Sequence, residues 1–450
     1  MLADTCDDGG WLAGEDSNLQ HTAPKAVVLP LNYPPPRAGW YRSANRVAQN
    51  QPVRQLDDGT GGVVRCPAWP DLRPFDSPGI ARTRGMPSDS KLSAVVLAAG
   101  EGTRMRSERP KPLHRLCGRP MVLHVLHALA ELNLERAVVV VGHGASRVTK
   151  AVDEQPPPGL HIDFVEQRVQ RGTGDAVSVA LTAFPDDDVD DGDIVVLPGD
   201  TPLLRPPTLA ALVRTHRGAE AAATVLTARL ADPTGYGRVA RDRNDRVARI
   251  VEQADATPDE LAIDEINTSI YVFRRSVLAP ALRRLTPDNA QGEYYLTDVI
   301  GVLHDAGYPV VSTVVDDSME AAGVNDRHQL SVAEAELRSR INERWMRRGV
   351  TMVDPEATYV DTTVELAPDV VLYPGTYLQG HTVVDAGAEL GPYTQLLDCR
   401  VGAGAWVAAT IGSSAEIGAE ARVGPWAHLA PGSLVPERVE TGPGFHARQG

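Results

Sequence analysis

The stretch Leu97-Ala98-Ala99-Gly100-Glu101-Gly102-Thr103-Arg104-Met105 decides the fold of this chain. It follows Ser93–Leu97, a mostly apolar run that is typical of a strand buried on both faces of a sheet. Glycines directly after such a strand let the main chain approach a phosphate, which exposed N–H groups can then bind. Arg104, and Lys111 seven residues later, add the positive charge that a triphosphate requires. The stretch therefore predicts a phosphate-binding turn at the end of a buried strand.

Two general nucleotide-binding motifs fit this turn poorly. A dinucleotide-binding fold expects G-x-G-x-x-G, but Met105 stands where the third glycine belongs. The P-loop pattern G-x-x-x-x-G-K-[ST] does not occur there either. The glycine turn alone is weak evidence, so the surrounding pattern has to identify the fold.

Residues 91–328 alternate between predicted strands and helices. Residues 137–141 and 194–197 are further buried strands, and apolar residues recur at i, i+3, i+4 and i+7 in a predicted helix over 122–129. Such alternation indicates βαβ units and a mostly parallel sheet. A hairpin around a polar turn is predicted over residues 238–251. We therefore expect an α/β domain here.

A single helix that connects two regions is predicted over residues 329–349. Gly349 stands where a helix C-cap is expected. The apolar stripe of this helix consists of Leu330, Ala333, Leu337, Ile341 and Trp345. Because an apolar stripe needs a partner, we expect this helix to pack against a neighbouring domain or subunit.

Residues 350–450 carry a six-residue repeat. Aliphatic residues recur at this step at Ile411, Ile417, Val423, Leu429 and Val435. The spacing indicates a triangular coil, in which each six residues form one face and the aliphatic residue points inward.

The composition argues against several classes of protein. The chain has 450 residues with 44 Lys+Arg against 59 Asp+Glu, a net charge of −15, which argues against a nucleic-acid-binding protein with a basic face. It contains no apolar run of eighteen residues, so we expect no membrane-spanning helix. The four cysteines form no C-x-x-C pair, which argues against a structural zinc site and fits a reducing cytoplasm. We expect a cytoplasmic protein.

Residues 1–90 are not expected to form a domain. Prolines and glycines interrupt any period there, and the apolar residues are scattered, which predicts disorder. Met86 lies just before the first convincing strand, and our hypothesis is that it is the physiological start. The alternative is a regulatory tail, and N-terminal sequencing of the native protein would separate the two.

Further motifs follow the phosphate-binding turn in order. They are Pro110–Leu113, Gln170–Ala176, Leu197–Leu203, Pro233–Arg238, Glu265–Thr268, Asn289–Tyr295 and Gly323–Asp326. Together with the repeat, they resemble the family of bifunctional N-acetylglucosamine-1-phosphate uridylyltransferases/glucosamine-1-phosphate acetyltransferases. The resemblance covers about residues 92–442. It implies a Rossmann-like nucleotidyltransferase domain followed by a left-handed parallel β-helix, which is incomplete here.

The resemblance implies an enzyme of cell-wall precursor synthesis. It would join UTP and N-acetylglucosamine 1-phosphate, with Mg²⁺, to give UDP-N-acetylglucosamine and pyrophosphate. Residues that would contact the nucleotide through their backbone are Leu97, Ala98, Ala99 and Gly100. Residues that would read the uracil and ribose are Gln167, Gly172 and Thr173. Residues that would bind the sugar are Gly237, Glu252 and Asn267. Asp200 and Asn325 would hold Mg²⁺ through oxygen atoms, and Asn325 and Lys111 would also contact substrate.

The implied chemistry fits these residue types. The sugar phosphate oxygen that attacks the α-phosphorus of UTP is already an anion, so no general base or covalent nucleophile is required. Catalysis is then mostly positioning and neutralisation of charge, which makes Arg104 and Lys111 the predicted catalytic residues. Asp200 follows the end of a predicted strand, where α/β sheets place their ligands.

Several of these residues have a structural alternative. Asp200 could cap the turn before Pro202, and Asn325 could be the N-cap of the next helix. Lys111 could be a solvated surface lysine. His143 follows a strand, and we interpret it as a turn residue.

The resemblance also implies a homotrimer and an acetyl-CoA-dependent acetyltransferase site on the β-helix. The catalytic segment of the family lies further along the coil than Gly450, and Ala430 replaces the arginine that precedes Pro-Gly in the family. We therefore expect acetyltransferase activity to be absent or nearly so.

Two other functions remain open. The chain could be a nucleotidylyltransferase for glucose 1-phosphate, or a non-enzymatic truncated scaffold whose repeat mediates assembly. A pyrophosphate-release assay with each sugar phosphate would separate these functions.

Overall fold

A computed structural model describes residues 91–184 and 192–447 of the chain. The expectations for residues 1–90, including Met86 as the start, lie outside these described residues. The described residues belong to one compact unit. Within the described part, no helix is long and apolar enough to cross a membrane.

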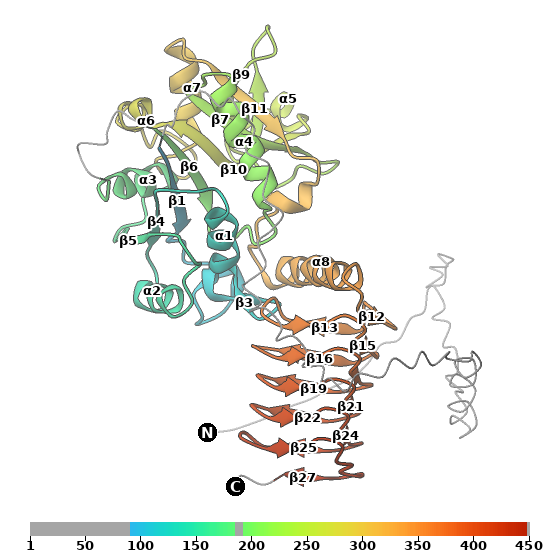
Figure 1. Cartoon of the computed structure of the whole chain (residues 1–450). Coiled ribbons are helices and arrows are strands. Elements are labelled where there is room, and N and C mark those ends of the chain that lie inside the picture. Colours follow the sequence, from blue (N-terminus) through green and yellow to red (C-terminus); the bar gives the residue numbers. More distant parts are fainter. Residues whose placement is uncertain (1–90, 185–191, 448–450) are drawn as a thin grey trace, which may run out of the picture. The chain divides into compact units, whose positions relative to one another are not determined.

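A nine-stranded mixed sheet forms the centre of the first region of this unit (Figure 1). Its strands are β1 (Leu92–Ala98), β4 (Arg136–Val141), β5 (Ile162–Glu166), β6 (Asp193–Pro198), β7 (Ala223–Arg229), β8 (Arg238–Arg241), β9 (Val247–Val251), β10 (Glu265–Arg274) and β11 (Val310–Val314). The main path runs β11-β7-β10-β6-β1-β4-β5. All neighbours on this path are parallel except β10, which is antiparallel to both β6 and β7. The predicted mostly parallel sheet is confirmed.

Helices cover both faces of this sheet. They are α1 (Met121–Ala130), α2 (Ala145–Glu154), α3 (Thr173–Leu181), α4 (Pro206–Gly218), α6 (Arg275–Leu282) and α7 (Asp298–Asp305). Ala94 and Val96 of β1 belong to one buried cluster with α1, α2 and α4, whereas Val95 belongs to a second cluster with α3, α6 and α7. Because side chains of a strand alternate between faces, a strand covered on both sides is mostly apolar, and Ser93 is the one polar residue of β1.

Two small additions stand beside the main path of the sheet. Strands β8 and β9 form the predicted antiparallel hairpin, and Ile266 of β10 pairs with Arg238 of β8. The short helix α5 (Pro258–Leu261) follows the hairpin. Strands β2 (Arg115–Leu116) and β3 (Arg119–Pro120) form a separate antiparallel ribbon after the phosphate-binding turn.

Helix α8 (Arg327–Met346) joins the sheet region to the repeat. Its stripe divides between two partners. Ala333 packs in a cluster with Leu203 and Val324 of the sheet region, whereas Ile341 and Trp345 pack against the coil core. Pairing of one apolar stripe with both regions explains why a single stripe suffices on this helix.

The repeat forms a parallel β-helix of three stacked sheets, so the predicted β-helix fold is confirmed. The first sheet contains β12 (Thr351–Met352), β15 (Val371–Leu372), β18 (Glu389–Leu390), β21 (Trp406–Val407) and β24 (Arg422–Val423). The second contains β13 (Thr358–Val360), β16 (Thr376–Gln379), β19 (Gln395–Leu397), β22 (Ile411–Ser413), β25 (His428–Leu429) and β27 (His446–Ala447), whose stacking Figure 1 shows. The third contains β14 (Glu365–Leu366), β17 (Val383–Val384), β20 (Arg400–Val401), β23 (Glu416–Ile417) and β26 (Leu434–Val435).

The inward position of one coil differs from the prediction. Ile411 is 56% exposed, so the expectation that it points inward is wrong. Gly412 pairs with Leu396 above and Leu429 below, and it occupies the inward position instead. From Leu396 to Gly412 the coil advances 16 residues rather than 18, which moves the repeat out of phase with a strict count of six.

Candidate active site

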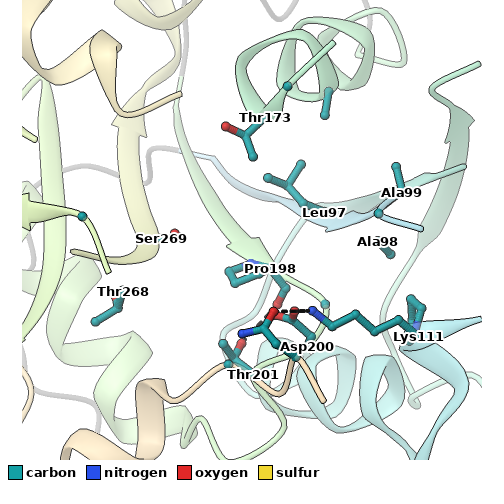
Figure 2. Close-up of a pocket in the computed structure, with 18 of the residues that line it drawn as sticks. Leu97, Ala98, Ala99, Lys111, Thr173, Pro198, Asp200, Thr201, Thr268 and Ser269 are labelled. Carbon is teal, nitrogen blue, oxygen red and sulfur yellow. Dashed lines mark hydrogen bonds and ion pairs between the residues drawn. The ribbon is translucent and has the colours of Figure 1, made fainter. Parts of the chain in front are cut away.

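One cavity of about 500 Å³ lies at the carboxyl ends of β1 and β6 (Figure 2). All the residues predicted from the sequence to bind or catalyse line it. They are Leu97, Ala98, Ala99, Gly100, Arg104, Lys111, Gln167, Gly172, Thr173, Asp200, Gly237, Glu252, Asn267 and Asn325. Their positions span more than 200 residues of sequence, so the fold brings them together.

The phosphate-binding turn leaves its main chain open to the cavity. A Cβ atom added at Gly100 would meet nothing within 4 Å. Gly102 has a φ of +66°, and a Cβ atom there would lie 2.5 Å from Cβ of Lys111. Glycine at position 102 therefore permits both the left-handed backbone and the close approach of the segment that carries Lys111. Met105, which breaks the dinucleotide motif, is buried.

Lys111 lies between the two predicted metal ligands. Its Nζ donates to Oδ2 of Asp200 and, over 2.8 Å, to Oδ1 of Asn325. Figure 2 shows the Lys111 side chain extended toward Asp200. Arg104 Nη2 donates to the same Asn325 Oδ1 over 3.0 Å. The Lys111 side chain is only 14% exposed, so it is not a freely solvated surface lysine.

The backbone holds Asp200 and Asn325 side by side. Asp200 follows β6, and its carbonyl oxygen accepts a hydrogen bond of 2.9 Å from the Val324 N–H. Asn325 lies two residues before α8, and the N-cap of that helix is Asp326, whose carboxylate accepts from the Gln329 N–H. The alternative that Asn325 caps the helix is therefore wrong. The Asn325 carboxamide is free to face the cavity because its neighbour satisfies the helix end.

The donor set of these two residues fits a hard divalent cation. One carboxylate and one amide oxygen converge on a single positive group, the Lys111 ammonium. Mg²⁺ prefers oxygen ligands and commonly takes few from the protein, with the rest from water and substrate phosphates. Within the described residues, no group of three or more His, Cys, Asp or Glu side chains could hold a metal ion.

Gln167, Gly172 and Thr173 form one wall of the cavity. Gln167 follows β5 and is 6% exposed, and its Nε2 donates to the Gly172 carbonyl and to Oδ2 of Asp175. Gly172 has a φ of +108°, and a Cβ atom there would lie 2.5 Å from the Tyr294 carbonyl oxygen. Thr173 begins α3, and its hydroxyl accepts from the Leu296 N–H over 3.0 Å. The segment around Tyr294 therefore fixes this wall.

Gly237, Glu252 and Asn267 meet in another part of the cavity lining. A Cβ atom at Gly237 would lie 3.3 Å from Glu252 Oε2 and 3.6 Å from Cβ of Asn267. The Gly237 carbonyl also accepts from the Asn267 N–H over 2.9 Å. These contacts place a carboxylate and a carboxamide beside a position without a side chain, which leaves room for a polar ligand.

The electrostatics of Glu252 are unusual for a surface-facing carboxylate. Burial raises its pKa above the ordinary value, and the negative charges of Asp298 and Asp255 raise it further. A hydrogen bond from the Thr297 hydroxyl, at 3.2 Å from Oε1, acts in the opposite direction. A carboxylate with shifted pKa in a cavity is a candidate for ligand recognition.

Two residues that line the cavity, Gln170 and Tyr236, were not predicted from the sequence to bind or catalyse. Gln170 lines the cavity, and its Nε2 donates to the Ala99 carbonyl over 2.6 Å, which ties two walls together. Tyr236 also lines it, and burial together with the Asp200 charge raises the pKa of its phenol. Both lie inside motifs that the sequence singled out, but only the fold shows that their side chains reach the cavity. His143 is exposed in the turn before α2 and is not among the lining residues.

Known proteins resemble this chain over most of its length. The family model for nucleotidyl transferases matches residues 93–346. The bifunctional protein GlmU of Desulfitobacterium hafniense is 45% identical over 350 residues, which cover 78% of this chain and 75% of that protein. GlmU of Mycolicibacterium vanbaalenii is 49% identical over 342 residues, which cover 76% of this chain and 69% of that protein. GlmU of Thermobifida fusca is 46% identical over 331 residues, covering 73% and 68%. A nucleotidyl transferase sheet, a stacked parallel coil and identities of this size agree, and we conclude that the chain belongs to the GlmU family of nucleotidyl transferases.

Proposed function

We propose that this enzyme transfers UMP from UTP to N-acetylglucosamine 1-phosphate, giving UDP-N-acetylglucosamine and pyrophosphate. One observation carries the proposal. A single cavity holds two cationic side chains and two oxygen ligands at one end, and a half-buried carboxylate with a carboxamide at the other. The first end suits a triphosphate, and the second suits the hydroxyl and amide groups of a sugar.

At the phosphate end, Lys111 and Arg104 neutralise charge. The phosphate oxygen of the sugar attacks the α-phosphorus of UTP, a new P–O bond forms, and the bond to the pyrophosphate group breaks. Both reactants are anions, and the leaving pyrophosphate gains charge. Preorganised cations that stabilise this charge lower the barrier. The main chain around Gly100 offers N–H groups to the same phosphates.

At the nucleoside end, Gln167, Gly172 and Thr173 would bind the uracil and ribose. Hydrogen bonds to the segment around Tyr294 hold this wall in position, so it is ordered before the substrate binds. At the sugar end, Glu252 and Asn267 would accept from and donate to the N-acetylglucosamine group, with Gly237 providing room.

Asp200 and Asn325 would hold Mg²⁺. When bound there, the cation would neutralise the phosphate oxygens that the two substrates bring together. Lys111 now donates to both ligand oxygens, so metal binding requires the ammonium to turn away. The phosphates of UTP offer it a new partner.

A pyrophosphate-release assay tests the proposal. With UTP and Mg²⁺, we expect much faster turnover with N-acetylglucosamine 1-phosphate than with glucose 1-phosphate. Asp200→Ala should abolish it. Preference for glucose 1-phosphate would support the alternative nucleotidylyltransferase, and no turnover with either sugar by the unaltered protein would favour a scaffold.

We also propose that the protein assembles as a homotrimer through its β-helix. The coil exposes large apolar side chains, with Tyr393 71% and Trp426 70% exposed. Exposed apolar groups of this size favour association with another surface. Light scattering on the purified protein should give three times the chain mass of 48.3 kDa, and a monomer mass would contradict this.

Loss of acetyltransferase activity remains a separate proposal. It is supported by Ala430, which replaces an arginine of the family's coil and follows β25. We expect no turnover of acetyl-CoA and glucosamine 1-phosphate above a control without enzyme. Turnover above that control would refute it.

A further inference from the structure

Two buried hydroxyl groups lie behind the proposed sugar site. The Thr297 hydroxyl donates to Glu252 Oε1 over 3.2 Å. The Tyr271 hydroxyl accepts from Asn267 Nδ2 over 2.8 Å. Neither Thr297 nor Tyr271 lines the cavity, whereas both of their partners do. The hydroxyls therefore touch the lining side chains from the protein side.

The side chain of Thr297 does not cap its own helix, although a threonine at this position commonly does. It is the N-cap of α7, where a threonine side chain commonly accepts from an N–H of the first helical turn. No such bond is present at this cap. The side chain is buried, and its hydroxyl points to Glu252 instead. Because the Thr297 hydroxyl does not cap its own helix, its hydrogen bond to the Glu252 carboxylate indicates a role there.

The Thr297 hydrogen bond lowers the pKa of Glu252, whereas burial and the neighbouring charges raise it. The groups that face Glu252 are Asp255, Asp298, Tyr271 and Tyr295. The two carboxylates disfavour the charged form of Glu252, as does its burial. The tyrosines are neutral at physiological pH, and burial raises their pKa values further. The Thr297 bond stabilises the ionised form that would accept from sugar hydroxyls.

Tyr271 fixes the orientation of the Asn267 carboxamide. Nδ2 of Asn267 donates to Tyr271, and Oδ1 accepts from the Ser269 N–H over 3.1 Å. Ser269 has a φ of +61°, and the pairing of β10 with β7 is irregular between Asn267 and Ile270. The Ser269 N–H can only donate, so it fixes which end of the carboxamide is oxygen, and the Tyr271 hydroxyl then accepts from the nitrogen. Tyr271 itself is held by its fully buried ring, which stacks on Phe273.

We propose that Thr297 and Tyr271 are positioning residues that set the affinity of this enzyme for its sugar phosphate. They act through Glu252 and Asn267 and leave the nucleotide end unaffected. The inference rests on the proposed function, since it assigns the sugar to this end of the cavity.

Steady-state kinetics of pyrophosphate release test it with Thr297→Val, Thr297→Ser and Tyr271→Phe. Loss of a hydrogen bond to a charged group predicts a rise of about tenfold in KM for N-acetylglucosamine 1-phosphate for Thr297→Val. A smaller rise, roughly three- to fivefold, is expected for Tyr271→Phe because its bond is between neutral groups. KM for UTP should stay unchanged in both. Thr297→Ser keeps the hydroxyl and should restore the wild-type value.

A pH profile and a matched control separate positioning from folding. In Thr297→Val, the acidic limb of kcat/KM for the sugar phosphate should move to higher pH, because Glu252 loses the bond that favours its charge. Thr208→Val is the control, since the Thr208 hydroxyl bonds the buried carboxylate of Glu320 and Thr208 does not line the cavity. It should lower Tm and leave both KM values unchanged.

The outcomes are distinguishable. If the wild-type protein shows no turnover with UTP and N-acetylglucosamine 1-phosphate, the proposed function fails. If the wild type is active and folded Thr297→Val and Tyr271→Phe keep its KM for the sugar phosphate, the inference alone fails. Equal rises in KM for both substrates would also overturn it, because they indicate a general disturbance of the cavity.

Discussion

Lys111 Nζ donates to Asn325 Oδ1 over 2.8 Å, although 214 positions separate the two residues. The contact joins the segment that follows the phosphate-binding turn to the stretch just before α8. The same ammonium bonds Asp200. In the protein alone, a lysine thus satisfies the oxygens that would hold a divalent cation.

Replacement of Lys111 by methionine should therefore have two opposite effects. Turnover should fall by about 100-fold or more, because a cation that stabilises the transition state is lost. Divalent metal binding to the nucleotide-free protein should become tighter, because the ammonium no longer competes for Asp200 and Asn325. Mn²⁺ titration followed by electron paramagnetic resonance measures the second effect.

Lys150→Met is the control for this pair of measurements. Lys150 is 74% exposed and pairs with Glu154 on the surface of α2. It should change neither turnover nor Mn²⁺ affinity. Weaker Mn²⁺ binding in Lys111→Met would contradict competition between the ammonium and the metal.

Substitutions of the neighbouring residues Asn325 and Asp326, just before α8, should affect turnover and stability separately. Asn325→Ala removes an oxygen from the cavity, so turnover should fall by about 100-fold while Tm stays nearly constant. Asp326→Ala removes the N-cap that accepts from the Gln329 N–H, which costs about 1 kcal/mol of stability. It should lower Tm and leave kcat largely intact. Reversed effects would show that Asn325 has a structural role.

The sequence predicted the strands because their chemistry is local. Ser93–Leu97 is mostly apolar, and this pattern is sufficient to indicate a strand covered on both faces. The motifs also predicted which residues meet in the cavity, through the family resemblance. Neither pattern nor motif predicts Thr297, because its contact with Glu252 depends on how α7 packs against the hairpin rather than on its neighbours in sequence.

The coil shows the limit of a periodic argument. Ile411 and Gly412 fit a count of six, yet the count places the wrong one inward. Each strand of the coil is only two to four residues long, and a face shortened by one residue, as between Val407 and Gly412, exchanges the inward and outward positions. The pairing of Gly412 with Leu396 and Leu429 decides the register, and it is a property of the three-dimensional stack.

Addition of one methyl group at Gly237 should weaken sugar binding selectively. Its Cβ atom would lie 3.2 Å from Cγ2 of Ile250 and 3.3 Å from Glu252 Oε2. We expect Gly237→Ala to raise KM for the sugar phosphate by roughly tenfold, since it displaces Glu252 and fills space that the ligand needs. KM for UTP should change little. Gly218→Ala, at the end of α4 with nothing within 4 Å of the added atom, should leave both KM values unchanged.

Glu252→Gln should stabilise the protein while it impairs the enzyme. The folded state raises the pKa of Glu252, so folding favours the protonated form and loses stability as pH rises from the ordinary glutamate pKa through the higher folded value. Glutamine has no charge, so at pH 7.5 the variant should gain about 1–3 °C in Tm, and the gain should shrink toward pH 5. KM for the sugar phosphate should rise at the same time.

Glu260→Gln is the control of opposite sign, because bonds from the Thr257 N–H and hydroxyl, and the Arg249 charge, lower the pKa of Glu260. That variant should lose stability at pH 7.5. A lower Tm for Glu252→Gln at pH 7.5, or a gain that does not vary with pH, would show that the burial of this charge does not oppose folding.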